Sequence, residues 1–156
     1  MLNRVELLAD VRAAPGSRRM PHFAKAALEA SLPARGIAYE HMPDLGGHRT
    51  ARRDSINTGW RNASFRGYAD YMQEHAFRAA VEVLVAKARN RRTAIMCAEA
   101  VPWRCHRSLI SDALTLGGVE VRHITGKSAP SPHAVTTFAR VEEGRISYPA
   151  ADTLPM

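Results

Sequence analysis

The sequence predicts an α/β fold: one domain over residues 1–156, with three α/β/α layers around a mainly parallel sheet of about four to five strands. Three observations predict it. Short apolar runs with strand character alternate with segments of helical spacing. Residues 93–124 form a strand, a helix and a second strand in succession, and such a connection joins parallel strands. A length of 156 residues suits a single domain with a substantial core.

In the first half, short elements are separated by loops that contain proline and glycine. The predicted elements are a buried strand at 5–11, a loop with Pro15 and Pro21, a helix at 23–32 that ends at Pro33, and a strand at 37–42 that ends at Pro43. The connector that follows, residues 44–66, is longer than ordinary structureless connections, which is typical of lids and binding loops.

The second half predicts a long helix at 68–90, with a break near Glu74, followed by the strand–helix–strand unit. In that unit a strand covers 93–96, a helix begins near Cys105 and stops at Gly117, and a strand covers 119–124. We expect a loop-like tail after Ile124 and a short edge strand at 145–148.

The chain is strongly basic, with a formal charge of +7 and a pI near 10.1. This excess of positive charge favours anionic partners, either small molecules or nucleic acid. Arginines that only face water, without binding a partner, would give the same net charge. No apolar run is long enough for a bilayer, and no charged-then-apolar leader opens the sequence, so we expect no membrane partner. Two cysteines without a secretion signal favour free thiols and a cytoplasmic location. The sequence leaves the oligomeric state open.

Polar residues follow the predicted strands where each strand ends, and ligands of open α/β sheets bind beyond such ends. We therefore expect several distant residues to meet at one edge of the sheet. They are Asp10, Arg12, His41, Cys97, Glu99 and His123, joined by Cys105, His106 and Arg107 from the start of the next helix.

Four stretches carry a family resemblance: DVRAAPGSRRMPHF, YEHMPDLGG, GWRNASFRGYADYM and MCAEAVPWRCHRSLISDAL. They resemble the bacterial family called domain of unknown function 488 (DUF488), from about Val5 to Tyr148. The resemblance implies an α/β fold with a site at the Cys-Ala-Glu and Cys-His-Arg motifs, and implies no established reaction. Family members usually carry an extra strand and helix, with a Gly-His-Ser-like motif, before the Asp-Val-Arg segment. We expect that segment to be missing here.

An anion site is the first candidate chemistry. Arg12, Arg18 and Arg107 are the expected anion ligands, because a helix start offers free N–H groups and arginine forms forked contacts with phosphate. Pairing of these arginines with Asp10 and Glu99, to hold the turns together, is the alternative.

Catalysis by a thiol is the second candidate. A cysteine in the first turn of a helix, beside histidine and arginine, favours its thiolate, which makes Cys97 and Cys105 candidate catalytic residues with Glu99, Asp10 and His106 as polar or acid–base groups. The layout is similar to cysteine phosphatases and rhodanese-like sulfurtransferases. However, six residues instead of five separate Cys97 from Arg104, and the loop is not glycine-rich. Both cysteines could instead be small buried hydrophobic residues.

Two further alternatives remain. We predict no cofactor, but Cys97, Glu99, Cys105 and His106 are suitable ligand types for zinc or iron. Nucleic-acid contacts are expected from Arg49, Arg52, Arg53 and Trp60 on the long connector, unless that loop is solvated and its aromatic residues pack on the sheet. The preferred function is a hydrolase or transferase that acts on nucleotides or nucleic acid. A non-catalytic module that binds nucleic acid or a partner, and a metal-dependent enzyme, are the alternatives.

Overall fold

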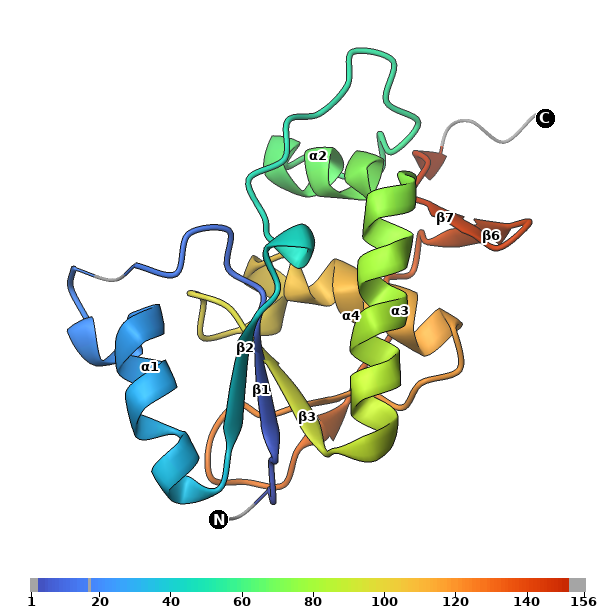
Figure 1. Cartoon of the computed structure of the whole chain (residues 1–156). Coiled ribbons are helices and arrows are strands. Elements are labelled where there is room, and N and C mark those ends of the chain that lie inside the picture. Colours follow the sequence, from blue (N-terminus) through green and yellow to red (C-terminus); the bar gives the residue numbers. More distant parts are fainter. Residues whose placement is uncertain (1–2, 17, 152–156) are drawn as a thin grey trace.

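A three-stranded parallel sheet forms the centre of the molecule (Figure 1). The computed structural model describes residues 3–16 and 18–151. The strands are β1 (Leu7–Asp10), β2 (Ala38–His41) and β3 (Thr93–Met96), in the order β2-β1-β3. Leu7 pairs with Ala38 on one side and with Thr93 on the other, so the carboxyl ends of all three strands meet at one edge. The three predicted strands are therefore confirmed; β3 has the predicted bounds, and β1 and β2 are one or two residues shorter at each end.

Helices lie on both sides of these strands, with α1 on one side and α3 on the other in Figure 1. The helices are α1 (Lys25–Ser31), α2 (Ala63–Tyr71), α3 (His75–Asn90) and α4 (Arg107–Leu116), with short 3-10 turns at Pro21–Phe23, Pro33–Arg35, Pro43–Leu45 and Pro102–Arg104. Buried residues of β1, α2, α3 and α4 form one core, in which Ala9, Tyr68, Leu84 and Leu109 take part. None of the described helices is long and apolar enough to cross a membrane.

The predicted helix at 68–90 is two helices. The predicted break near Glu74 is confirmed, but the first helix begins earlier, at Ala63. Asn62 caps it, because its Oδ1 accepts hydrogen bonds from the N–H groups of Ser64 (2.8 Å) and Phe65 (3.3 Å). The long connector is therefore shorter than the sequence predicts.

The four to five parallel strands are not confirmed, because residues 119–124 do not join the central sheet. Only Arg122–His123 (β4) are in strand conformation, and they pair antiparallel with Ser131–Pro132 (β5). The physical reason is a competing partner: the His133 N–H donates to the Val121 carbonyl (2.9 Å). Near the C-terminus β6 (Arg140–Glu142) and β7 (Arg145–Ser147) form a hairpin, which contains the predicted edge strand at 145–148.

Candidate active site

Two cysteine sulfurs touch at the carboxyl edge of the sheet. Cys97 directly follows β3, and Cys105 directly precedes the first turn of α4. Their Sγ atoms lie 2.8 Å apart, and both thiols are free. The Cys97 side chain is half-buried, whereas Cys105 is only 7% exposed. Access to the pair is therefore from the Cys97 side.

Arg107 surrounds Cys105 Sγ with donors. Its backbone N–H lies 3.3 Å from the sulfur, its Nε lies 3.1 Å away, and its Nη2 donates to the Glu99 carbonyl at 2.6 Å. The hydrogen bond from the Cys97 thiol and these two Arg107 contacts outweigh burial and lower the pKa of Cys105 to about 6. The same hydrogen bond, with burial, raises the pKa of Cys97. At neutral pH the pair therefore holds one thiolate and one thiol.

Glu99 contributes its backbone to this arrangement. Its N–H donates to Cys97 Sγ at 3.3 Å, while its carbonyl accepts from Arg107. Among the described residues we find no hydrogen bond or ion pair of the Glu99 carboxylate, which is exposed. Within this geometry, Glu99 shapes the loop that follows β3.

His106 faces away from the sulfurs. Its Nε2 donates to the Val11 carbonyl at 2.8 Å, and its ring packs against Tyr68 at a centroid distance of 5.0 Å. A Cβ atom on Gly47 would lie 3.0 Å from Nδ1 of this imidazole, so the absence of a side chain at Gly47 makes room for the ring. Burial is the main reason that the pKa of His106 is lowered. A neutral His106 therefore ties the start of α4 to the end of β1.

A buried ion pair ends β1. Asp10 is fully buried and accepts from Arg12 Nε (2.8 Å) and Nη2 (2.7 Å), and also from the Tyr39 hydroxyl. Arg12 Nη2 also donates to the Phe23 carbonyl at 2.8 Å, and His41 Nε2 donates to the Arg12 carbonyl at 2.7 Å. Nε and Nη2 of Arg12 are thus committed to protein atoms, which favours the structural role among the alternatives for this residue.

The other predicted site residues lie apart from the sulfurs. Arg18 is exposed, and among the described residues we find no hydrogen bond or ion pair that joins it to the thiol pair. On the connector, Arg49 lies over the ring of Tyr71 at 3.6 Å, and Arg52 pairs with Asp54. Arg53 is exposed, whereas Trp60 packs against Phe65, Phe138 and Tyr148. The partly buried aromatic ring at position 60 therefore packs against the core, as in the alternative in which the aromatic residues of the connector pack on the fold.

The sequence model of one family, described as Domain of unknown function DUF488, matches residues 2–114. The chain belongs to this family. No curated protein and no solved structure that was compared with the chain gives a significant match. The matched residues of this DUF488 chain include the thiol pair, Asp10 and Arg12, while β4 to β7 follow the matched region. The resemblance seen in the sequence is thereby confirmed as far as Leu114.

The geometry of the DUF488 chain gives little support to a metal site at the four predicted ligands. Within residues 3–16 and 18–151, no group of three or more His, Cys, Asp or Glu side chains is placed to hold a metal ion. Two of the four predicted ligands are turned elsewhere, since His106 binds the Val11 carbonyl and Glu99 approaches the sulfurs only through its backbone.

Sequence reasoning missed three groups that organise this region. Tyr39 binds Asp10, Gly47 makes room for His106, and Asp112 accepts hydrogen bonds from His133 and Tyr148. The period-two pattern of β2 was a signal for Tyr39, because it places this residue on one face with His41. The partners of Asp112 come from a tail with no regular pattern, so no comparable signal existed there.

Proposed function

We propose that this DUF488 chain is a cysteine-dependent transferase or hydrolase for an anionic substrate of the phosphate or nucleotide type. Its nucleophile is the Cys105 thiolate, at the carboxyl edge of the sheet. The observation that carries the proposal is the set of three donors around Cys105 Sγ: the Cys97 thiol at 2.8 Å, Arg107 Nε at 3.1 Å and the Arg107 backbone N–H at 3.3 Å. Such surroundings stabilise the thiolate, and the thiolate is the reactive form of cysteine.

Charge supports the anionic class of substrate. The chain carries +7, and the Arg107 guanidinium lies directly beside the sulfur. Nε and Nη2 of Arg107 have protein partners, and we find none for its Nη1 within the described chain. In this proposal Arg107 binds the anion. The ion pair between Arg12 and Asp10 has a structural role and stabilises the carboxyl edge of the sheet. Free thiols suit a reducing compartment, so the proposal includes a cytosolic location.

The proposed reaction has two displacement steps. Cys105 Sγ forms a bond to the electrophilic atom of the substrate, and the leaving group departs with its electron pair. Water in a hydrolase, or a second acceptor in a transferase, then takes the group from sulfur and restores the thiolate. We assign His106 no role as the base for this step, because its Nε2 proton is held by the Val11 carbonyl and its Nδ1 lies against Gly47.

A covalent adduct on Cys105 is the test of this proposal. Purified protein is incubated with acetyl phosphate and with a panel of nucleoside phosphates, and both intact mass and product formation are measured. We expect an adduct and turnover in wild type and in Cys97→Ser, and neither in Cys105→Ser. Turnover that survives in Cys105→Ser, or the absence of adduct and turnover with every compound, would overturn the proposal.

Thiol–disulfide exchange is a second candidate, favoured by the 2.8 Å separation of the sulfurs. The thiolate would attack a substrate disulfide and release one substrate thiol. The second cysteine would then displace the other substrate thiol and close a Cys97–Cys105 disulfide, so that the protein is oxidised and the substrate reduced. Incubation with oxidised glutathione decides this candidate. Loss of two hydrogens from the protein mass, reversed by dithiothreitol, supports it, and a stable mixed disulfide or no reaction contradicts it.

A further inference from the structure

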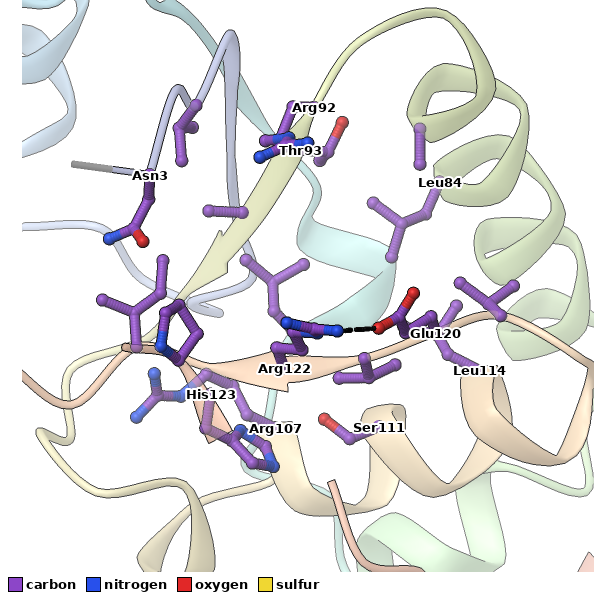
Figure 2. A pocket seen from close by; sticks show the side chains of 18 of the residues that line it. Asn3, Leu84, Arg92, Thr93, Arg107, Ser111, Leu114, Glu120, Arg122 and His123 are labelled. Carbon is purple, nitrogen blue, oxygen red and sulfur yellow. Dashed lines mark hydrogen bonds and ion pairs between the residues drawn. The ribbon is translucent and has the colours of Figure 1, made fainter. Parts of the chain in front are cut away.

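A cavity of about 680 Å³ lies beside β3, in the space between this strand and residues 119–124 (Figure 2). Its volume is in the usual range for sites that bind small molecules. Apolar side chains of α3, α4, β3 and the 119–124 segment form most of the wall; they include Leu84, Val85, Ile95, Leu114, Val119 and Val121. Such a wall suits a ligand with an apolar body.

The polar part of the wall is positively charged. Arg92, Arg107 and Arg122 line the cavity with a single carboxylate, Glu120, which pairs with Arg122 at 2.6 Å. Two guanidinium charges are therefore left without a carboxylate on this wall. Figure 2 shows Arg107 and His123 near one another, away from Leu84. A negative charge on a ligand would be stabilised at that end.

His123 ends a chain of hydrogen bonds that begins at a buried carboxylate. Asp112 on α4 is fully buried and accepts from the Tyr148 hydroxyl (2.8 Å) and the Thr136 N–H (3.1 Å). It also binds His133 Nε2 at 2.7 Å, and His133 Nδ1 lies 2.7 Å from His123 Nε2. The three side chains form one line, Asp112–His133–His123, which reaches the cavity wall.

This line fixes the tautomer of both histidines. A carboxylate only accepts, so His133 Nε2 carries a proton, and in a neutral His133 the Nδ1 atom carries the lone pair. His123 Nε2 must then be the donor to His133, which leaves the lone pair of His123 on Nδ1. For that atom we find no protein partner in the described part of the chain. Burial, His133 and Arg107 together lower the pKa of His123, so the imidazole is neutral at pH 7 before an acid binds.

We infer that the cavity binds a weakly acidic organic molecule with an apolar body, such as a phenol or an enol, and that His123 Nδ1 takes its proton. The O–H bond of the ligand breaks, the proton forms an N–H bond at His123, and the ligand remains as an anion beside Arg107. His123 can pass its Nε2 proton to His133, which places the imidazolium against the Asp112 carboxylate. His133 and Asp112 are positioning residues, because neither lines the cavity.

The two neighbouring side chains that shift the pKa of His123, those of His133 and Arg107, act in one direction. His133 follows β5, Arg107 comes from α4, Arg122 and Glu120 come from the same segment as His123, and Arg92 lies further along the wall. Arg107 and His133 oppose a positive charge on His123 when no anion is present. The anion formed from the ligand reverses this effect, so proton transfer and anion binding support one another. This inference uses no cysteine, although it shares Arg107 with the proposed enzyme.

The test uses 4-nitrophenol, whose anion absorbs at longer wavelength than the neutral phenol. Wild-type protein is titrated into the phenol at a pH about one unit below the phenol's own pKa. We expect the phenolate band to grow on binding, with at least a fivefold smaller increase in His123→Gln and an unchanged increase in Arg35→Met, whose exposed side chain does not line the cavity. Ala88→Phe, which fills the cavity, should abolish binding, whereas Ala86→Phe on a different face of α3 should not.

Several outcomes would overturn the inference. They are no binding at millimolar phenol, binding as the neutral phenol, and an undiminished phenolate band in His123→Gln. Nitrogen-15 NMR of histidine-labelled wild type provides a measurement that depends on no variant. It should show His123 with its proton on Nε2, and this signal should change in Asp112→Asn if that residue positions the line. A proton on His123 Nδ1 in the wild type would contradict the assignment.

Discussion

The Sγ atoms of Cys97 and Cys105 lie 2.8 Å apart, although the two residues follow different elements of the fold. The end of β3 supplies one sulfur and the start of α4 supplies the other. Because the two thiols share one hydrogen bond, the first proton leaves the pair easily and the second is held. Arg107 places its backbone N–H and its Nε against Cys105 Sγ, which favours the thiolate at the more buried sulfur.

This asymmetry predicts the pH dependence of alkylation. The rate of reaction with iodoacetamide, followed by mass spectrometry, should rise with pH and reach half its plateau near pH 6, the pKa of Cys105. Cys97→Ala removes the S–H donor and should move the midpoint to higher pH, while Cys97→Ser retains a donor and should move it less. A wild-type midpoint near the ordinary cysteine value of about 8.5 would contradict the assigned thiolate.

Arg12→Met should destabilise the fold strongly. The change leaves the fully buried Asp10 carboxylate without its charged partner, and such losses cost about 3–5 kcal/mol. The free energy of unfolding in urea provides the measurement. Arg35→Met is the matched control, because Arg35 is exposed on a 3-10 turn, and it should change stability by no more than about 0.5 kcal/mol. A similar small effect for both variants would show that the Asp10–Arg12 pair adds no stability.

The pKa of Asp10 also predicts how the stability of the fold depends on pH. Burial alone would raise the pKa of this carboxyl, but the hydrogen bonds from Arg12 and Tyr39 and the charge of Arg12 outweigh it and lower the pKa below its usual value. The unfolded chain therefore binds the proton more readily than the folded chain. The stabilisation is complete above the unfolded pKa of about 3.9 and is lost as the pH falls through the folded value.

Urea unfolding of wild type and Asp10→Asn between about pH 5 and pH 3 measures this contribution. The variant should be less stable at pH 5, and the difference between the two proteins should shrink as the pH falls. A difference that stays constant over this range would mean that the Asp10 pKa is the same in the folded and unfolded chains.

The sequence predicted those elements whose signal is local. Short apolar runs mark β1 and β3, and Gly117 and Gly118 end α4 where expected, with Gly118 at a φ of +86°. The start of α2 also had a local signal, since asparagine is a favourable N-cap residue and Asn62 directly precedes the helix, but the predicted helix began at Tyr68. The carboxyl-edge cysteines were found because strand ends in a parallel sheet meet at one edge.

The structural features that the sequence did not predict depend on contacts between distant residues. Asp70 accepts from the Arg52 N–H (2.8 Å), the Ser55 hydroxyl (2.6 Å) and Asn57 Nδ2 (2.7 Å), and these bonds fold the long connector onto α2. Residues 119–124 have strand character, yet their partner is the tail near His133 and not β3. No local pattern distinguishes these two pairings, because either one satisfies the same backbone groups.

Gly67→Ala tests whether the connector packs on α2 as described. In an exposed helix, alanine is more favourable than glycine by about 1 kcal/mol. Here a Cβ on Gly67 would overlap the Arg49 carbonyl oxygen and would lie 2.8 Å from the Ala51 nitrogen. Both are backbone atoms, so the connector itself must move. Because overpacking of this kind costs about 1–3 kcal/mol or more, the clash should outweigh the gain in helix propensity.

We therefore expect Gly67→Ala to lower the free energy of unfolding by about 1–3 kcal/mol, and to increase hydrogen exchange at the backbone of residues 49–57. Gly126→Ala is the matched control, because a Cβ added there would have nothing within 4 Å and the residue lies in a loop; it should have little effect on either measurement. A stabilising Gly67→Ala would mean that helix propensity prevails, and that Arg49 and Ala51 do not contact α2 in solution. Since Gly47 and His106 meet only two residues before Arg49, such a result would also question how the connector is held over the thiol site.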